Sequence, residues 1–180
     1  MTISNQNKMT LFFIRQLYHY RSLNLLLCLI SIFSMAIALY MQYQMRLDPC
    51  LLCHFQRASV ILMGVTAIAA FVHNPAYRGR IIYTLLSLVW ALLGISTAAR
   101  HIWIQNLPDH AVPACGPDLF YMLERFPIFE TFSTVWHGSG DCHSISWTLW
   151  GISLPEYVLA LLMVYVFIYG WILLKAKQLS

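Results

Sequence analysis

Two cysteines, Cys50 and Cys53, lie at the start of an apolar segment in the stretch QMRLDPCLLCHFQR (44–57). Asp48 is a good helix N-cap and Pro49 suits the first helical position, so the sequence predicts that a helix begins here. Cysteines three apart in a helix share one face. In the first turns, the unpaired backbone N–H groups and the helix dipole favour a thiolate. Spacing and position therefore predict a redox-active pair rather than two packing residues.

Arg57 follows Cys53 by four residues, which places it one helical turn deeper on the same face. A cation beside a thiol stabilises the thiolate and can also hold an anionic partner. The alternative interpretation is an arginine at a helix end whose charged group reaches for the membrane surface. The register with Cys53 favours the functional role.

A second pair of cysteines lies in turn-rich sequence. Cys115 is flanked by prolines and a glycine in VPACGPD, and Cys142 lies in HGSGDCHS. Their separation of 27 residues suits a loop-closing disulfide, which stabilises a loop by about 3–4 kcal/mol in the chain-entropy description. The fifth cysteine, Cys28, lies inside an apolar stretch without polar neighbours, and we expect it only to pack.

Histidines near these cysteines also suggest zinc, namely His54, His137 and His143. A strong zinc pattern needs two Cys-x-x-Cys pairs, and only one pair here has that spacing. We therefore predict no metal site.

The elements that must position these residues follow from composition. The chain has 180 residues, of which 59% are hydrophobic and only 10% charged, and its mean hydropathy is +0.65. A soluble domain carries about a quarter charged residues, whereas about 20 apolar residues cross a membrane. Four segments meet that requirement: 23–43, 55–72, 81–99 and 154–174. The sequence predicts an all-α membrane protein, a single domain (1–180) built as a four-transmembrane-helix bundle.

Basic residues predict the orientation. With both termini inside, seven of the eleven Lys and Arg residues are cytoplasmic: Lys8, Arg15, Arg21, Arg78, Arg80, Lys175 and Lys177. The other four lie outside: Arg46, Arg57, Arg100 and Arg125. This is the bias that the positive-inside rule requires. Ala36-Ile37-Ala38 is similar to a signal-peptidase site, but the apolar run before and around it exceeds the roughly 7–15 residues of a signal segment.

The predicted loops on the outer side are 44–54 and 104–153, and both hold cysteines. Disulfides persist on such an oxidising face. The longer loop is rich in Phe, Trp, Leu and Met, so we expect it to be ordered and partly helical. Residues 118–132 are predicted to form a short amphipathic stretch at the headgroups, broken at Pro127. A small folded cap over the bundle is the alternative.

Together these features resemble the disulfide bond formation protein B (DsbB) family. The resemblance covers about residues 20–175 and rests on the four spans and on Pro-Cys-Leu-Leu-Cys with its arginine four residues on. Further matching stretches are ARHIWIQNLP (99–108), VPACGPDLFYML (112–123) and GSGDC (138–142), followed by Trp147, Gly151, Ser153 and Pro155. Tyr157 stands where many relatives have Trp, a departure that leaves the chemistry unaffected.

The resemblance implies a bacterial inner-membrane enzyme with periplasmic cysteines. It would reoxidise the periplasmic dithiol oxidase DsbA and pass the electrons to a membrane quinone, ubiquinone or menaquinone. It implies that Cys53 engages the quinone while Arg57 stabilises the reduced species, and that Cys50 exchanges with the loop pair. Cys115 would form the mixed disulfide with DsbA, with Cys142 as its partner. No nucleic-acid partner is expected.

Arg100 and His101, at the outer end of the third span, are expected to line the same pocket, with interfacial anchoring as the alternative. Two other function classes stay open. A quinone-linked enzyme of the vitamin K epoxide reductase type has four helices too, but its Cys-x-x-Cys is expected near the last helix. A membrane scaffold with structural disulfides would show no thiol turnover.

Overall fold

A computed structural model of the chain describes residues 2–112, 119–127, 129–130, 133, 136, 140–145 and 147–178. Four long helices make up most of this structure: α1 (Thr2–Gln44), α2 (Leu51–His73), α3 (Tyr77–Gln105) and α6 (Leu154–Gln178). Within the described residues, the connection between α3 and α6 contains five short elements: η1 (Asp109–Ala111), α4 (Leu119–Arg125), η2 (Gly140–Cys142), β1 (Thr148–Leu149) and β2 (Ile152–Ser153).

Each long helix contains a stretch that is long and apolar enough to cross a membrane. These stretches are Tyr20–Gln44, Leu51–His73, Tyr77–Gln105 and Leu154–Leu174. Each of the four predicted segments lies within one of them, so the all-α fold with four membrane-crossing helices is confirmed. The outward faces fit this setting, since Phe33, Val72 and Phe167 are 67%, 70% and 71% exposed. Apolar surface of this extent is stable against lipid rather than against water.

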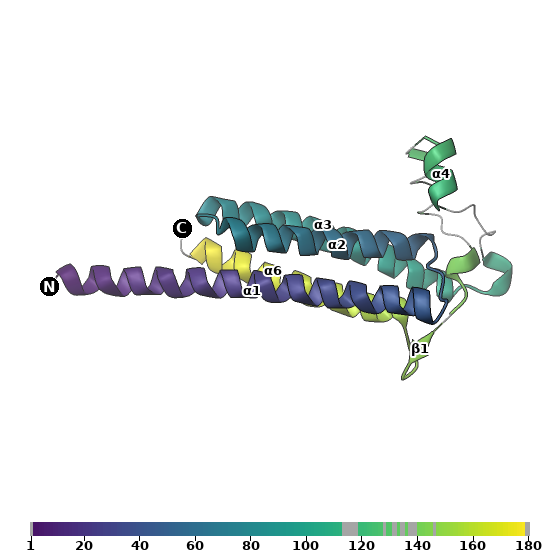
Figure 1. Ribbon diagram of the computed structural model, residues 1–180, viewed down its shortest axis with the longest axis horizontal. Helices are drawn as coiled ribbons and strands as arrows, with labels where there is room; N and C mark the ends of the chain where they lie inside the picture. Colours follow the sequence, from purple (N-terminus) through teal and green to yellow (C-terminus); the bar gives the residue numbers. More distant parts are fainter. Residues whose placement is uncertain are drawn as a thin grey trace.

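The four long helices lie side by side in a bundle, with α1 against α2, α2 against α3, and α3 against α6 (Figure 1). Both termini lie at one end of this bundle, and the short elements gather at the other end. The N-terminal part of α1 extends beyond the other helices. An even number of crossings requires both termini to lie on one side of a membrane, as the sequence analysis expects.

Small residues let the helices approach closely. A Cβ added at Gly94 on α3 would lie 2.8 Å from Leu162 Cδ1 and 3.0 Å from Ser59 Cβ. A Cβ at Gly64 on α2 would lie 3.0 Å from Ser31 Cβ on α1. Between membrane helices, such close contact replaces the hydrophobic driving force that water supplies to soluble proteins.

Hydrogen bonds from tyrosine side chains of α6 connect this helix to α1 inside the bundle. Tyr165 on α6 donates to Leu27 O at 2.6 Å, and its hydroxyl lies 2.8 Å from Ser31 Oγ. Tyr169, one turn later, donates to Asn24 Oδ1 at 3.5 Å. Both tyrosines are almost fully buried. These bonds satisfy polar groups that lipid cannot solvate.

The start of α2 differs from the prediction. Cys50, not Asp48, is the N-cap residue, with φ −69° and ψ 172°, and no side chain caps the helix. The prediction was wrong because the chain must first cross from α1 to α2. Leu47 N–H still bonds to Met41 O at the end of α1, so the residues up to Cys50 are needed as a non-helical connection. Helix formation therefore begins at Leu51.

A small hairpin precedes α6, which the sequence analysis did not predict. Thr148 pairs with Ser153 and Leu149 with Ile152 in antiparallel register. Trp150 and Gly151 form the turn with φ of 53° and 80°; two consecutive positive φ angles are typical of tight hairpins. The hairpin ends in the helix start itself, where Ser153 N–H donates to Glu156 Oε2 at 2.6 Å. This is one half of a capping box, and it sets the direction of α6.

Candidate active site

The two cysteines of the Cys-x-x-Cys motif face each other at the start of α2. Cys50 Sγ lies 3.4 Å from Cys53 Sγ, and both side chains are half-buried. Cys50 is the N-cap and Cys53 lies in the first turn, where the helix itself favours a thiolate. A disulfide requires sulfurs about 2 Å apart, so small side-chain rotations bring the two sulfurs to bonding distance when an oxidant removes two electrons from the pair.

His101 on α3 lies against both thiols. Its Nε2 is 3.8 Å from Cys50 Sγ and its Nδ1 is 3.8 Å from Cys53 Sγ. The ring is 4% exposed, and Gln56 Nε2 lies 3.4 Å from its Nδ1. An imidazole in this position can take a proton from one thiol and return it to another. The contact joins α2 and α3 at the end of the bundle where the short elements gather (Figure 1).

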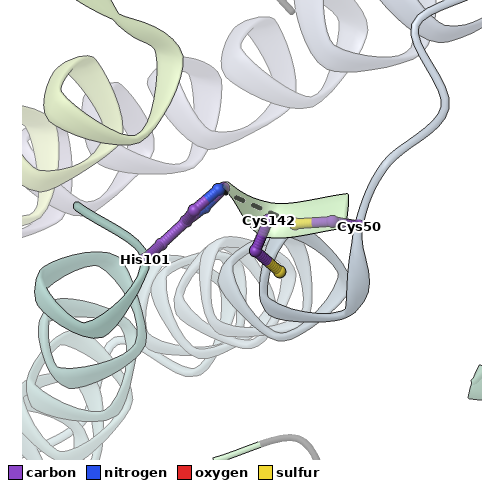
Figure 2. A group of neighbouring side chains, drawn as sticks. All are labelled: Cys50, His101 and Cys142. Carbon is purple, nitrogen blue, oxygen red and sulfur yellow. Dashed lines mark hydrogen bonds between the residues drawn. The ribbon is translucent and has the colours of Figure 1, made fainter. Parts of the chain in front are cut away.

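A third thiol reaches the same place from the long connection. Cys142, on η2, is fully buried, and its Sγ lies within 4.8 Å of donor atoms of Cys50 and His101. Figure 2 shows these three side chains converging from separate elements. His143 Nδ1 lies 2.9 Å from Ile104 O, which ties η2 to the end of α3. The contact between His143 and α3 therefore fixes the position of the neighbouring Cys142 thiol.

The predicted partner of Cys142 falls outside the described residues. Cys115 lies in the segment 113–118, so the Cys115–Cys142 disulfide of the sequence analysis stays a prediction. The next described element after this segment is α4, which ends at Arg125, ahead of the predicted break at Pro127. Its Met122 is 2% exposed and belongs to a buried cluster with Leu51 and Leu52 of α2.

Arg57 is held by the first helix. Its guanidinium donates to Gln42 Oε1 and, at 3.1 Å, to Ala38 O of α1. Both acceptors lie on α1 within the membrane-crossing stretch. The arginine therefore keeps a fixed orientation on the inner wall of the bundle.

A cavity of about 150 Å³ opens beside these residues. Its apolar wall comes from α1 and α6 and includes Met35, Ile37, Ala38, Met41, Val158 and Leu161. Its polar wall includes Asp48, Cys50, Cys53, Gln56, Arg57, His101, Gln105 and Asp141. The cavity thus places the Cys50–Cys53 pair and the Arg57 cation beside a surface that suits an apolar molecule.

In the structure, the side chains of Arg100 and His101 lie in different surroundings. His101 lines the cavity, whereas Arg100 is not among the residues that line it. The Arg100 Nε donates to Trp136 O at 3.0 Å, and its guanidinium lies 5.3 Å from the centre of the Trp103 ring. Arg100 therefore contacts Trp136 and Trp103 near the C-terminal end of α3 rather than the cavity, and interfacial anchoring stays a prediction.

Gln56 and Gln42 were missed by the sequence analysis. Gln56 is 4% exposed and contacts His101. Its position three residues after Cys53 put it on the same helix face, which was a usable signal. Gln42 interrupts the apolar end of the first span, and its bond to Arg57 depends on how α1 and α2 pack. Cys28, 5% exposed in the bundle core, packs as expected.

Four membrane-crossing helices that hold a dithiol, a further thiol and a buried histidine at one end define a membrane thiol oxidoreductase. Comparison with known proteins agrees. A family model described as Disulfide bond formation protein DsbB matches residues 20–172. The chain therefore belongs to the DsbB family of disulfide bond formation proteins, as the resemblance predicted. It is a multi-pass membrane oxidoreductase that generates disulfide bonds.

Individual relatives align over most of their length. Disulfide bond formation protein B of Acinetobacter baylyi is 40% identical over 159 residues, which cover 88% of this chain and 93% of that protein. Disulfide bond formation protein B 1 of Pseudomonas aeruginosa is 41% identical over 146 residues, covering 81% and 90%. The relative from Nitrosococcus oceani is 42% identical over 125 residues, covering 69% and 74%.

Proposed function

We propose that the protein is a quinone-dependent thiol oxidase that reoxidises a DsbA-type periplasmic dithiol protein. Electrons pass through Cys50 and Cys53 to a membrane quinone, either ubiquinone or menaquinone, and from there to the respiratory chain. The observation that carries the proposal is the cavity at Cys53. Its walls come from membrane-crossing helices, and its lining places the dithiol beside Arg57, Gln56 and His101.

The residues around the cavity fit a quinone. The apolar wall from α1 and α6 suits a ring and chain that arrive from lipid. Arg57, Gln56 and His101 offer hydrogen-bond donors to ring oxygens, which take up negative charge during reduction. A quinone, when bound, accepts two electrons and two protons and leaves as a quinol.

The proposed thiol chemistry begins in the long connection. A DsbA thiolate attacks Cys115 of a Cys115–Cys142 disulfide, which forms a mixed disulfide and frees the Cys142 thiolate. Cys142 then attacks Cys50 of the Cys50–Cys53 disulfide, so that a Cys50–Cys142 bond forms and Cys53 leaves as a thiolate. The grouping of Cys50, Cys142 and His101 within 4.8 Å supports this transfer.

Cys53 completes the cycle. Before Cys53 can act, the second DsbA thiol attacks the mixed disulfide, so that DsbA departs in its disulfide form and the Cys115 thiolate is freed. Cys115 then attacks Cys142 of the Cys50–Cys142 bond, which restores the Cys115–Cys142 disulfide and frees the Cys50 thiolate. With a quinone bound in the cavity, Cys50 and Cys53 would reclose as a disulfide and supply the two electrons that the quinone takes up. The two protons of the DsbA dithiol end on the quinol, with His101 placed to carry protons between the sulfurs and the cavity. The sum is one dithiol oxidised and one quinone reduced.

We further propose that the protein lies in the bacterial inner membrane with both termini in the cytoplasm and the active cysteines in the periplasm. The excess of basic residues near the termini and the 74–76 turn supports this orientation. The arrangement in Figure 1 supports it as well, because α4 and η2 lie at the end opposite the termini.

The test is quinone reduction by the purified protein in detergent, with reduced DsbA as electron donor and a short-chain ubiquinone as acceptor. Serine at Cys50, Cys53, Cys115 or Cys142 is expected to lower turnover by at least a hundredfold. Cys28→Ala is the matched control and keeps turnover within twofold, because Cys28 packs in the core. Turnover that survives Cys53→Ser would contradict the proposal. A scaffold protein would show no turnover even without substitution.

A further inference from the structure

The reduced form of the site brings together ligands that a soft metal prefers. Cys50, Cys142 and His101 each offer one donor atom, and these atoms lie within 4.8 Å of one another. They come from the start of α2, from η2 and from α3, so the grouping depends on the folded bundle (Figure 2). Thiolate and imidazole donors select Zn²⁺ and related ions over the harder Mg²⁺ and Ca²⁺.

The spacing of the donors is close to that of a tetrahedral site. With Zn–S of about 2.3 Å and Zn–N of about 2.0 Å, tetrahedral donors lie roughly 3.5–3.8 Å apart. The observed separation of Cys50 Sγ from His101 Nε2 is 3.8 Å. The limit of 4.8 Å for the full group leaves about 1 Å to close, which side-chain rotation can supply. Burial of Cys142 and His101 keeps competing water away.

The charges around the group also favour a cation. Asp48 and Asp141 line the adjoining cavity. Arg57 lies on that cavity too, but its guanidinium is bound to Gln42 and Ala38 on α1. Cys53 Sγ, 3.4 Å from Cys50 Sγ, adds a third sulfur, and thus a fourth donor atom, beside the group.

We propose that the fully reduced protein binds one thiophilic divalent metal ion, tested as Zn²⁺, through Cys50, Cys142 and His101. Binding replaces the protons of the two thiols, which pass to solvent, and changes no oxidation state. A Cys50–Cys53 disulfide removes one thiolate ligand, so the oxidised protein lacks the site. A bound ion would therefore hold the enzyme in its dithiol form and block the reclosing of Cys50 on Cys53.

The test measures Zn²⁺ binding alone, without quinone or DsbA, so its outcome is independent of the proposed electron acceptor and donor. Full-length protein in detergent is reduced, freed of reductant without oxygen, and titrated with Zn²⁺ against a chromophoric chelator. We expect one tightly bound ion per chain. His101→Gln and Cys142→Ala are expected to weaken binding at least tenfold. The matched controls His73→Gln and Cys28→Ala, which lie far from the group, are expected to bind as the unsubstituted protein does.

A second measurement needs no substitution. The unsubstituted protein is oxidised with diamide and titrated again, and binding is expected to fall at least tenfold and to return after reduction. Equal binding by the oxidised and reduced protein would overturn the proposal. So would wild-type affinity in folded His101→Gln, because the Cys-x-x-Cys pair alone would then hold the ion.

Discussion

Arg57 places a guanidinium group on the polar side of the cavity. Arg57 is fixed by two hydrogen bonds to α1, so it cannot simply extend to the membrane surface. A unit charge acting over about 5 Å at an effective dielectric of about 20 is worth roughly 3 kcal/mol before solvent screening. Even a third of that energy is enough to decide how well a reduced, partly anionic quinone is held.

Replacing Arg57 tests this role. Arg57→Met keeps much of the volume and removes the charge, and we expect the KM for quinone to rise about sixfold, which corresponds to a loss of about 1 kcal/mol. Arg57→Lys should be intermediate, because it keeps the charge but loses the planar fork. The first exchange between DsbA and the protein, measured without quinone, should be unchanged.

Arg46→Met is the matched control, since Arg46 lies just after the C-terminal end of α1, near the start of α2, but is not among the residues that line the cavity. It should leave the KM for quinone unaltered. Wild-type quinone kinetics in Arg57→Met would assign Arg57 to structural anchoring between α1 and α2.

The sequence could identify the dithiol but not its surroundings. Cys50, Cys53 and Arg57 are close in the chain, so helix geometry alone relates them. His101 is 48 residues from Cys53, and only the packing of α2 on α3 brings them together. Neighbours such as Arg100 and His101 point about 100° apart on a helix. Sequence reasoning could place both at the outer end of α3, but it could not say which one faces the thiols.

At the scale of the elements, hydropathy was enough to find the four helices, because nearly all of each span is apolar. Their exact ends were not predictable in the same way. The start of α2 depends on how far the chain must travel from α1, and the hairpin before α6 depends on two consecutive positive φ angles at Trp150 and Gly151. Both are set by tertiary geometry rather than by local preference.

Close packing of α3 on α6 and α2 predicts the effect of a single methyl group. Gly94→Ala would place a Cβ 2.8 Å from Leu162 Cδ1 and 3.0 Å from Ser59 Cβ. We expect it to destabilise the protein by about 1 kcal/mol net, since overpacking costs about 1–3 kcal/mol and alanine returns up to about 1 kcal/mol in helix propensity. Thermal unfolding in detergent, followed by circular dichroism, measures the difference.

Gly170→Ala on α6 is the control for this change. An added Cβ there meets nothing within 4 Å, so only the gain in helix propensity remains and the Tm should be equal or higher. If both alanine variants unfolded at the same temperature, the close contact at Gly94 would not be limiting stability.

At the scale of the whole molecule, the two ends of the helix bundle carry different parts of the chain. The termini and the 74–76 turn lie at one end, and α4 and η2 at the other (Figure 1). The native cysteines are poor probes of sidedness, because Cys142 is fully buried. Exposed positions are better. Glu124 on α4 and Ala76 in the turn are both exposed.

In a background without the native cysteines, Glu124→Cys should react with a membrane-impermeant maleimide in intact spheroplasts. Ala76→Cys should react only after lysis. The reverse pattern would place the thiol site on the cytoplasmic side and contradict the proposed periplasmic oxidase.

The tyrosines of α6 have a consequence for how the protein is made. The carbonyl of Leu27 and the side chains of Asn24 and Ser31 belong to the first helix that leaves the ribosome. Their partners Tyr165 and Tyr169 belong to the last. The contacts of Asn24 Oδ1 and Ser31 Oγ with these tyrosines can therefore form only after α6 has been made and has entered the membrane. Until then, α1 carries polar side chains that face lipid or the other helices without the hydroxyl partners that α6 supplies.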